Sequence, residues 1–186
     1  MRNHPSRLPM AELLWRLYPD AAGTLDEAAW RRCSQLVEEC TGEYYDTEQL
    51  RRLPLADEFG CLVLESDTRP GRPHGLLFSM RLDDTTARVL LFLVDMNLQN
   101  QGHGGQAWSE FSKRAMRDGV EVVQLEVRED NSGGQRFYHR LGRIDLLQLD
   151  VAHENPRSVF VEHRLDQLMG FRLDRGAALG QRACDL

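Results

Sequence analysis

The sequence lacks any hydrophobic run long enough to span a bilayer, and residues 1–5 do not begin a signal peptide. It also lacks an excess of positive charge, because the net charge is −6 and the pI is about 5.5. These absences argue against membrane and nucleic-acid partners, and we expect a cytoplasmic protein. The acidic balance slightly favours a cationic substrate.

Cysteine and histidine patterns that would indicate a metal site or a disulfide framework are also missing. The four cysteines include no Cys-x-x-Cys pair, and Cys33 and Cys40 fit an apolar helix face better than a disulfide. The six histidines lack metal-ligand spacing, and neither His153 nor His163 is expected to bind a metal. There is no nucleophile elbow and no internal repeat. We therefore expect one metal-free domain spanning residues 1–186.

The most informative segment is a strand that ends in a glycine-rich turn and continues into a helix. Residues 89–94 form an apolar run, Gly102, Gly104 and Gly105 follow, and a helical pattern of apolar residues begins at Ala107. The free amides and the dipole of a helix N-terminus attract anions, and glycines let a ligand reach the backbone. The segment therefore predicts a phosphate or pyrophosphate site.

Two other interpretations of this turn need to be weighed. It could be a tightly packed helix start without a ligand, although three glycines in four residues weaken a helix. It also satisfies the dinucleotide pattern Gly102-x-Gly104-x-x-Ala107, with Glu126 where a ribose-binding acid would lie. A dinucleotide fingerprint usually follows the first strand of its domain, whereas these glycines come past mid-chain. Too little chain follows them for a full dinucleotide fold.

Neighbouring segments provide the context of the turn. Residues 75–82 and 87–94 flank the turn sequence at 83–86, which predicts an antiparallel hairpin leading into the glycines. Residues 120–127 are rich in β-branched side chains and predict a further strand. A second set of motif residues follows that strand: Asn131, Phe137, Tyr138 and Gly142.

Together these blocks resemble the GCN5-related N-acetyltransferases. The family motif Gln/Arg-x-x-Gly-x-Gly/Ala is similar to Gln99-x-x-Gly102-x-Gly104, and the second block matches a strand, an Asn and a short helix carrying an aromatic-Tyr pair. The resemblance covers residues 60–165. It implies an α/β fold with a central mixed, mostly antiparallel sheet, flanked by helices, whose strands splay apart at the acetyl-CoA site. Gly133-Gly134 departs from the pattern and should loosen the start of that helix.

The resemblance also implies roles around an acetyl-CoA co-substrate. Backbone groups of Val94 and Met96 would hold the pantetheine and the thioester carbonyl, Gln99 would replace the commoner Arg, and Asn131 would bond the pantetheine. Amides of the turn would hold the pyrophosphate. The implied cofactor-binding residues are Val94, Asp95, Met96, Gln99, Asn100, Gln101, Gly102, His103, Gly104, Gly105, Asn131 and Tyr138.

Glu126 and Tyr138 are the expected catalytic residues. Residues 125–128 with Asn131 and Tyr138 look like the bacterial ribosomal-protein alanine N-acetyltransferases, in which the matching Glu and Tyr act as base and acid. Tyr138 would protonate the leaving thiolate, and Glu126 would accept the proton of the amine directly or through water. Strand alternation places Glu126 on the face opposite its two apolar neighbours. The alternative is a Glu126 that faces solvent or pairs with a neighbouring Arg.

The N-terminal third, residues 10–55, is expected to be helical. Residues 10–18 have helical apolar spacing, Thr-x-x-Glu at 24–27 predicts a capping box, and Asp46 should cap a short helix that runs to Leu53. No strand is evident before residue 24. The remaining expectations are a strand at 60–65, closing strands at 144–151 and 158–165, and a frayed tail at 170–186.

The resemblance implies that the region between the first strands shapes the acceptor pocket. Tyr44 and Tyr45 could line that pocket, while Trp30 is expected in the core. The acceptor itself stays open among small amines, including aminoglycosides and polyamines, and the amine of a protein or peptide. The oligomeric state stays open as well, a homodimer included.

The expected activity is acetyl transfer from acetyl-CoA to a primary amine, by direct attack in a ternary complex. The main alternative is a catalytically silent acyl-CoA-binding module of the same fold, which would bind acetyl-CoA and release no CoA. A dinucleotide-binding protein is the remote alternative.

Overall fold

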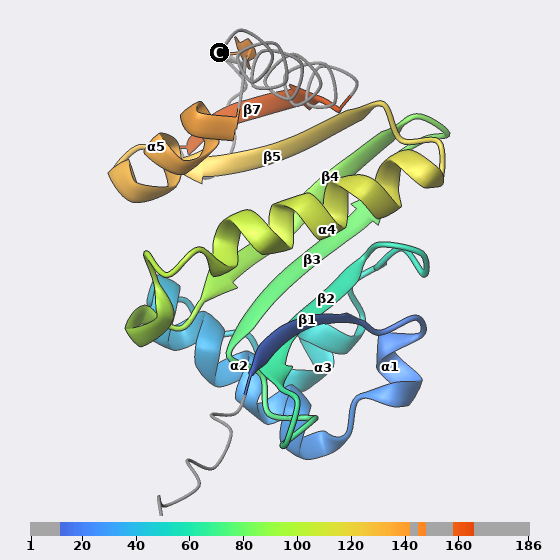
Figure 1. The fold of residues 1–186 in the computed structure, drawn as a ribbon, viewed down its shortest axis with the longest axis vertical. Helices are drawn as coiled ribbons and strands as arrows, with labels where there is room; N and C mark the ends of the chain where they lie inside the picture. Colours follow the sequence, from blue (N-terminus) through green and yellow to red (C-terminus); the bar gives the residue numbers. More distant parts are fainter. Residues whose placement is uncertain (1–11, 142–144, 148–157, 166–186) are drawn as a thin grey trace, which may run out of the picture.

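The computed structural model describes residues 12–141, 145–147 and 158–165, which form a seven-stranded sheet with helices on both faces (Figure 1). The strand order is β1-β2-β3-β4-β5-β7-β6, and all neighbouring strands are antiparallel except β4 and β5. The predicted mixed, mostly antiparallel sheet is confirmed. The strands are β1 Leu13–Leu17, β2 Cys61–Ser66, β3 Gly75–Arg81, β4 Thr86–Val94, β5 Val122–Arg128, β6 Asp145–Leu147 and β7 Ser158–Arg164.

Helices cover both faces of the sheet: α4 and α5 lie on one face, and α2 and α3 lie on the other (Figure 1). The predicted helix after the glycines and the one after Asn131 are confirmed as α4 and α5. The helical segments are α1 Ala21–Thr24, α2 Glu27–Thr41, α3 Thr47–Arg51, the 3₁₀ turn η1 Met96–Leu98, α4 His103–Arg117 and α5 Ser132–Leu141.

Helix caps correct one prediction and confirm another. The predicted capping box at residues 24–27 is wrong, because Thr24 ends α1 and the carboxylate of Asp26 accepts the amide of Ala29 at the start of α2. Asp46 does cap α3, in a capping box with Gln49. That helix ends at Arg51, before the predicted end.

The predicted helix at residues 10–18 is also wrong where the structure describes it, because residues 13–17 form strand β1. The burial of this segment alternates residue by residue, as a half-buried strand requires, and Trp15 lies on its inward side. The segment pairs along its length with β2. Tertiary pairing therefore overrides a spacing of leucines that fits a helix equally well.

A buried carboxylate ties β1 to β2. Glu65 is fully buried, and its oxygens accept hydrogen bonds from the Tyr18 hydroxyl at 2.8 Å and the Gly71 amide at 2.6 Å. The guanidinium of Arg16 lies 3.1 Å away and balances the charge. Burial, and then the hydrogen bond to Glu65, raise the pKa of Tyr18 to about 12.

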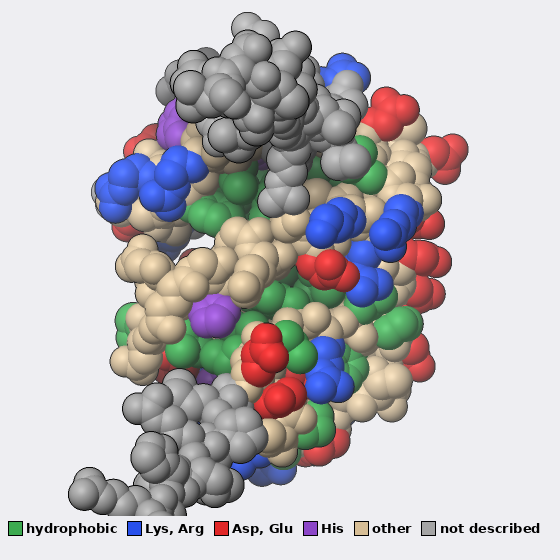
Figure 2. Space-filling model, viewed as in Figure 1, with side chains coloured by type: hydrophobic (Ala, Val, Ile, Leu, Met, Phe, Trp, Pro, Cys, Tyr) green, Lys and Arg blue, Asp and Glu red, His purple; other side chains and the backbone are tan. Residues whose placement is uncertain are grey.

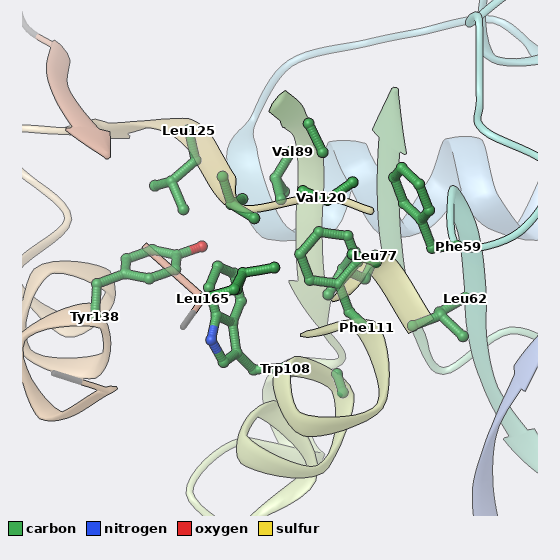
Figure 3. Close-up of a cluster of buried hydrophobic side chains, with 14 of the residues drawn as sticks. Phe59, Leu62, Leu77, Val89, Trp108, Phe111, Val120, Leu125, Tyr138 and Leu165 are labelled. Carbon is green, nitrogen blue, oxygen red and sulfur yellow. The ribbon is translucent and has the colours of Figure 1, made fainter. Parts of the chain in front are cut away.

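Each face of the sheet has its own core. On the α4 face, Trp108 and Phe111 pack against strand residues such as Leu125 (Figure 3). On the α2 face, Trp30 packs edge-on against Phe78 with ring centroids 6.1 Å apart, which confirms the prediction that Trp30 is a core residue. Because both faces are covered, every residue of β2 is buried.

The far end of the sheet agrees with the predicted closing hairpin. Strands β6 and β7 pair antiparallel, and β7 also pairs with β5 along Val122–Arg128. The predicted turn at 154–156, His153, Gly142 and the tail at 170–186 lie outside the described residues. No helix in the described part of the chain combines the length and the apolar character that crossing a membrane requires.

We expect Gly60→Ala to destabilise the fold by about 2–4 kcal/mol, because a Cβ there would overlap the backbone of Ala56 and the carbonyl oxygen of Ser79. Urea unfolding should show a lower midpoint with an unchanged slope. The matched control is Gly133→Ala in α5, where the Cβ would meet only the side-chain oxygen of Asn131 at 3.7 Å. It should stabilise by about 0.5–1 kcal/mol. Equal stabilities for the two variants would contradict the packing around Gly60.

Candidate functional site

Strands β4 and β5 pair only where they begin. The register pairs are Thr86 with Val122, Ala87 with Val123 and Arg88 with Gln124. Both strands then continue, β4 to residue 94 and β5 to residue 128, and in Figure 1 they diverge. We call the facing edges at 89–94 and 125–128 the strand split. Its backbone groups have no partner strand among the described residues, so an extended ligand could bind there.

A β-bulge bends β4 at the split. The register against β3 shifts by one residue, which leaves Leu90 as the extra residue. Before the bulge Val89 belongs to the α4 core, and after it Phe92 packs against that core while Leu91 packs against the α2 core. The bulge therefore reverses the alternation and turns β4 away from β5.

The connection from β4 to α4 presents a row of unused amides. Asn100 (φ 62°) and Gly102 (φ 92°) are left-handed, and α4 begins at His103 without a side-chain cap. No amide of residues 100–105 donates a hydrogen bond within the described chain. Since these amides lie at the positive end of the α4 dipole, the arrangement suits an anion.

Glycine at position 104 allows α5 to approach the start of α4. A Cβ on Gly104 would lie 3.3 Å from the ring of Phe137, which in turn packs edge-on against Phe92 with centroids 5.6 Å apart. A Cβ on Gly105 would meet nothing within 4 Å. Figure 2 shows the surface notched between α5 and the turn before α4. Gly105, rather than Gly104, therefore borders open space.

Side chains of the turn brace its backbone. The side-chain amide nitrogen of Gln99 donates to the carbonyl oxygen of Val94 at 3.0 Å, and the side-chain amide nitrogen of Gln101 donates to the carbonyl oxygen of Asn97 at 2.9 Å. The Gln99 side chain thus binds the carbonyl group of Val94, which is one of the groups expected to hold pantetheine. A ligand at Val94 would share this carbonyl oxygen, which has two lone pairs. Met96 follows on the surface and is 63% exposed.

An ion pair anchors the turn to α2, and the sequence analysis missed it. Arg32 lies 3.2 Å from the carboxylate of Asp95 and 2.9 Å from that of Glu39. Asp95 also accepts the amide of Asn97 at 3.0 Å. No sequence signal links these residues, because Arg32 and Asp95 belong to distant segments. On the other side, the indole of Trp15 donates to the His103 carbonyl oxygen at 3.0 Å.

Tyr138 lies on the buried side of α5. Its ring packs edge-on against Trp108 with centroids 5.6 Å apart, and Figure 3 shows its hydroxyl pointing from α5 into the core. Burial raises the pKa of Tyr138 well above its ordinary value. Like any tyrosine, Tyr138 is protonated at neutral pH, and its phenol could donate a proton to a group that reaches it.

Asn131 precedes α5 and caps it. Its side-chain oxygen accepts the amide of Gly134 at 2.8 Å. A Cβ on Gly134 would collide with that Asn131 side chain, which explains the glycine. The cap also offsets the loosening expected from Gly133-Gly134. The structure thus shows Asn131 in a capping contact at the edge of the split.

Glu126 lies on the opposite face of the sheet from Tyr138. Its neighbours Leu125 and Val127 are buried in the α4 core, so strand alternation turns Glu126 outward as predicted. Its carboxylate forms an ion pair with Arg88 of β4, across the closed end of the split. The structure therefore places the two expected catalytic residues on opposite faces of the sheet.

The two tyrosines lie in the loop between α2 and α3, close to the end of β5. Glu43 of this loop is 3.7 Å from Arg128, which places the loop on the face of Glu126. Tyr44 is 69% exposed. Tyr45 packs against the α2 core, and its carbonyl oxygen accepts the hydroxyl of Ser34 at 2.5 Å.

Metal ligands do not gather in this region. Within residues 12–141, 145–147 and 158–165 there is no group of three or more His, Cys, Asp or Glu side chains that could hold a metal ion. His163 is buried against Trp108, and burial lowers the pKa of its imidazole. Cys33 and Cys61 are buried free thiols, and burial raises the pKa of Cys33 to about 12.

Comparison with known proteins agrees with this geometry. The model of the acetyltransferase (GNAT) family matches residues 12–142. Ard1 from Thermoplasma volcanium is similar in structure with a TM-score of 0.64 and 21% identity, over 82% of this chain and 97% of Ard1. The ribosomal-protein-S18-alanine N-acetyltransferase from Escherichia coli has a TM-score of 0.61 at 14% identity, over 83% and 94% of the two chains.

A third similar structure is the NatC complex bound to Gag peptide and CoA, with a TM-score of 0.66 at 13% identity over 82% of this chain and 98% of that chain. No curated protein matches the chain. At these identities the structures show a shared fold.

We expect Gly104→Val to weaken acyl-CoA binding by about 1–3 kcal/mol, because the new side chain would press on Phe137 and displace amides at the start of α4. Calorimetry with acetyl-CoA should measure the loss. Gly133→Ala serves as the control and should bind normally. An unchanged affinity in folded Gly104→Val would mean that the anion binds elsewhere.

Proposed function

We propose that this chain, which belongs to the acetyltransferase (GNAT) family, transfers an acetyl group from acetyl-CoA to a primary amine by direct attack in a ternary complex. The observation that carries the proposal is the strand split with a row of unused amides at its open end. An acyl-CoA has an anionic pyrophosphate followed by an extended pantetheine arm. The amides of residues 100–105 suit the first, and the free edge of β4 suits the second.

Bound acetyl-CoA would supply an acetyl group activated as a thioester. Pyrophosphate would be held by the turn amides, and pantetheine by backbone groups of Val94 and Met96, with Asn131 contributing from the other side. Exposed basic residues on α5, Arg136 and Arg140, add positive charge near this path. In Figure 2 basic side chains lie over α5, above the notch.

Two proton transfers accompany the reaction. The amine nitrogen bonds to the carbonyl carbon, the carbon–sulfur bond breaks, and the sulfur takes a proton from Tyr138. The amine loses its own proton to Glu126, directly or through water. Backbone donors at the split would stabilise the developing oxyanion. A tyrosine phenol is protonated at neutral pH, as the role of an acid requires, and the position of Tyr138 in the helix that follows Asn131 supports it for that role.

The acceptor would approach from the face of Glu126, where Tyr44 and Tyr45 lie in the nearby loop. One of the similar structures is a ribosomal-protein-S18-alanine N-acetyltransferase and another is bound to Gag peptide, which makes the amine of a protein or peptide one candidate; a small amine is the other. A panel of amines, aminoglycosides and peptides, assayed by thiol release, tests the proposal. Release with any acceptor supports an enzyme. Binding of acetyl-CoA without release throughout would indicate a silent acyl-CoA-binding module.

Tyr138→Phe keeps the ring and removes the proton, so we expect kcat to fall roughly 10²-fold or more. The affinity for acetyl-CoA should barely change. Tyr18→Phe is the control, since it also removes a tyrosine hydroxyl, but one that is partly buried, follows β1 and donates a hydrogen bond to Glu65. It should lower stability and leave kcat unchanged. Full kcat for Tyr138→Phe at every pH would leave Tyr138 a packing residue.

Glu126→Gln should weaken activity in a way that identifies the role of the carboxylate. Loss of a base lowers kcat and alters the acidic limb of the pH profile. Loss of charge attraction instead raises the acceptor KM and blunts its salt dependence. Glu110→Gln on α4 is the control, because its carboxylate has a similar exposure and also pairs with an arginine. Wild-type pH and salt profiles in Glu126→Gln would exclude both roles.

A further inference from the structure

Arg88 occupies the position at which the split closes. It is the last residue of β4 in register with β5, opposite Gln124. Its guanidinium nevertheless forms its ion pair with Glu126, two residues further along β5. The side chain therefore reaches past the last strand pair and crosses the closed end of the split.

The face on which this pair lies is set by strand alternation. Ala87 and Val89, on either side of Arg88, are buried in the α4 core, as are Leu125 and Val127 beside Glu126. Both charged side chains therefore point to the other face of the sheet. Both side chains are partly exposed to solvent, with exposed fractions of 34% for Arg88 and 42% for Glu126.

The pair also lies where an extended ligand would end. A ligand whose anionic end is held by the amides of residues 100–105 enters at the open end of the split. If it continues along the free edge of β4, it runs toward Arg88, where β4 and β5 join. The reactive end of the proposed acetyl-CoA would thus lie further along β4 than Val94 and Met96, which the resemblance assigns to the pantetheine and the thioester carbonyl, and close to the Arg88–Glu126 pair.

We propose that Arg88 is a positioning residue that acts through Glu126. The inference rests on the proposed function. The guanidinium donates a hydrogen bond to the carboxylate and holds it at the closed end of the split. The contact therefore fixes where the carboxylate lies relative to the reacting groups in the proposed reaction.

Other charged groups on this face have contacts of their own. Arg128 lies 3.0 Å from Asp130 and 3.7 Å from Glu43. On β7, Glu162 lies opposite Gln124 and accepts its side-chain amide at 3.4 Å, and Arg164 lies opposite Val122. Arg88 is the basic residue placed directly on Glu126, so its removal should have the largest effect on that carboxylate.

The test compares Arg88→Gln, Arg88→Lys and the control Arg114→Gln. Arg114 pairs with Glu110 on α4 and is 33% exposed, which matches Arg88 closely. Exposed ion pairs contribute little to stability, so all three variants should fold. The measurement is the pH profile of kcat/KM for an acceptor found by thiol release, with calorimetry of acetyl-CoA as the binding control.

In Arg88→Gln we expect kcat/KM to be about 3–10-fold lower than in the wild type across the pH profile, because the carboxylate is no longer held at the closed end of the split. Arg88→Lys should restore much of this loss, because its ammonium group can still donate a hydrogen bond to the carboxylate. Arg114→Gln should leave the profile unchanged, and acetyl-CoA affinity should be unaffected throughout. In the double variant with Glu126→Gln, removing Arg88 should have no further effect.

The contrary outcomes separate the inference from the proposed function. If Arg88→Gln has the wild-type profile while Glu126→Gln is impaired, Arg88 has no positioning role, and the role of Glu126 stands. If Arg88→Gln lowers kcat/KM even in the Glu126→Gln background, Arg88 acts on its own and the inference is overturned. If Glu126→Gln is fully active, both roles fail, although thiol release still tests acetyl transfer.

Discussion

The structure depends on the point at which β4 and β5 stop pairing. Ending a parallel pair after Arg88 and Gln124 leaves the facing edges of both strands without a partner strand among the described residues. The bulge at Leu90 turns β4 aside, and β7 pairs with β5 along Val122–Arg128, so that β5 is held from its other edge. Aromatic rings from α4 and α5 fill the face beneath. These features keep the split open within an otherwise continuous sheet.

The turn after β4 also has backbone amides without hydrogen-bond partners among the described residues. A left-handed residue such as Asn100 costs about 1–3 kcal/mol unless its surroundings hold it in place. The side chains of Gln99 and Gln101 do so by bonding backbone carbonyl oxygens, and Asp95 fixes the turn to Arg32 of α2. The amides of residues 100–105 donate no hydrogen bond within the described chain, and they lie at the positive end of the α4 dipole. Rigid side-chain contacts therefore preorganise a backbone surface for a ligand.

Local signals in the sequence were enough to predict the hairpin, the glycine turn, α4 and β5, because each is specified by its own residues, whereas α5 was expected from the family resemblance. The prediction failed at residues 13–17, where alternation and helical spacing coincide and pairing with β2 decides. It did not foresee that Gly104 faces Phe137. That Glu126 faces outward and pairs with an arginine was the alternative weighed for this residue, and the structure identifies the arginine as Arg88. Those contacts join segments far apart in the chain, and their geometry depends on the bulge and the split. The expected roles of the site residues stay predictions.

In the proposed reaction the sheet separates two proton-transfer groups that need opposite surroundings. The proposed acid, Tyr138, is surrounded by Trp108 and Phe137 on the side covered by α4 and α5. The proposed base must be reachable by the acceptor, and Glu126 is exposed beside Arg88 on the other face. A closed sheet would keep these two groups apart. Because β4 and β5 separate beyond Arg88, a thioester lying in the split would be accessible from both faces, to the acid from one and to the base from the other.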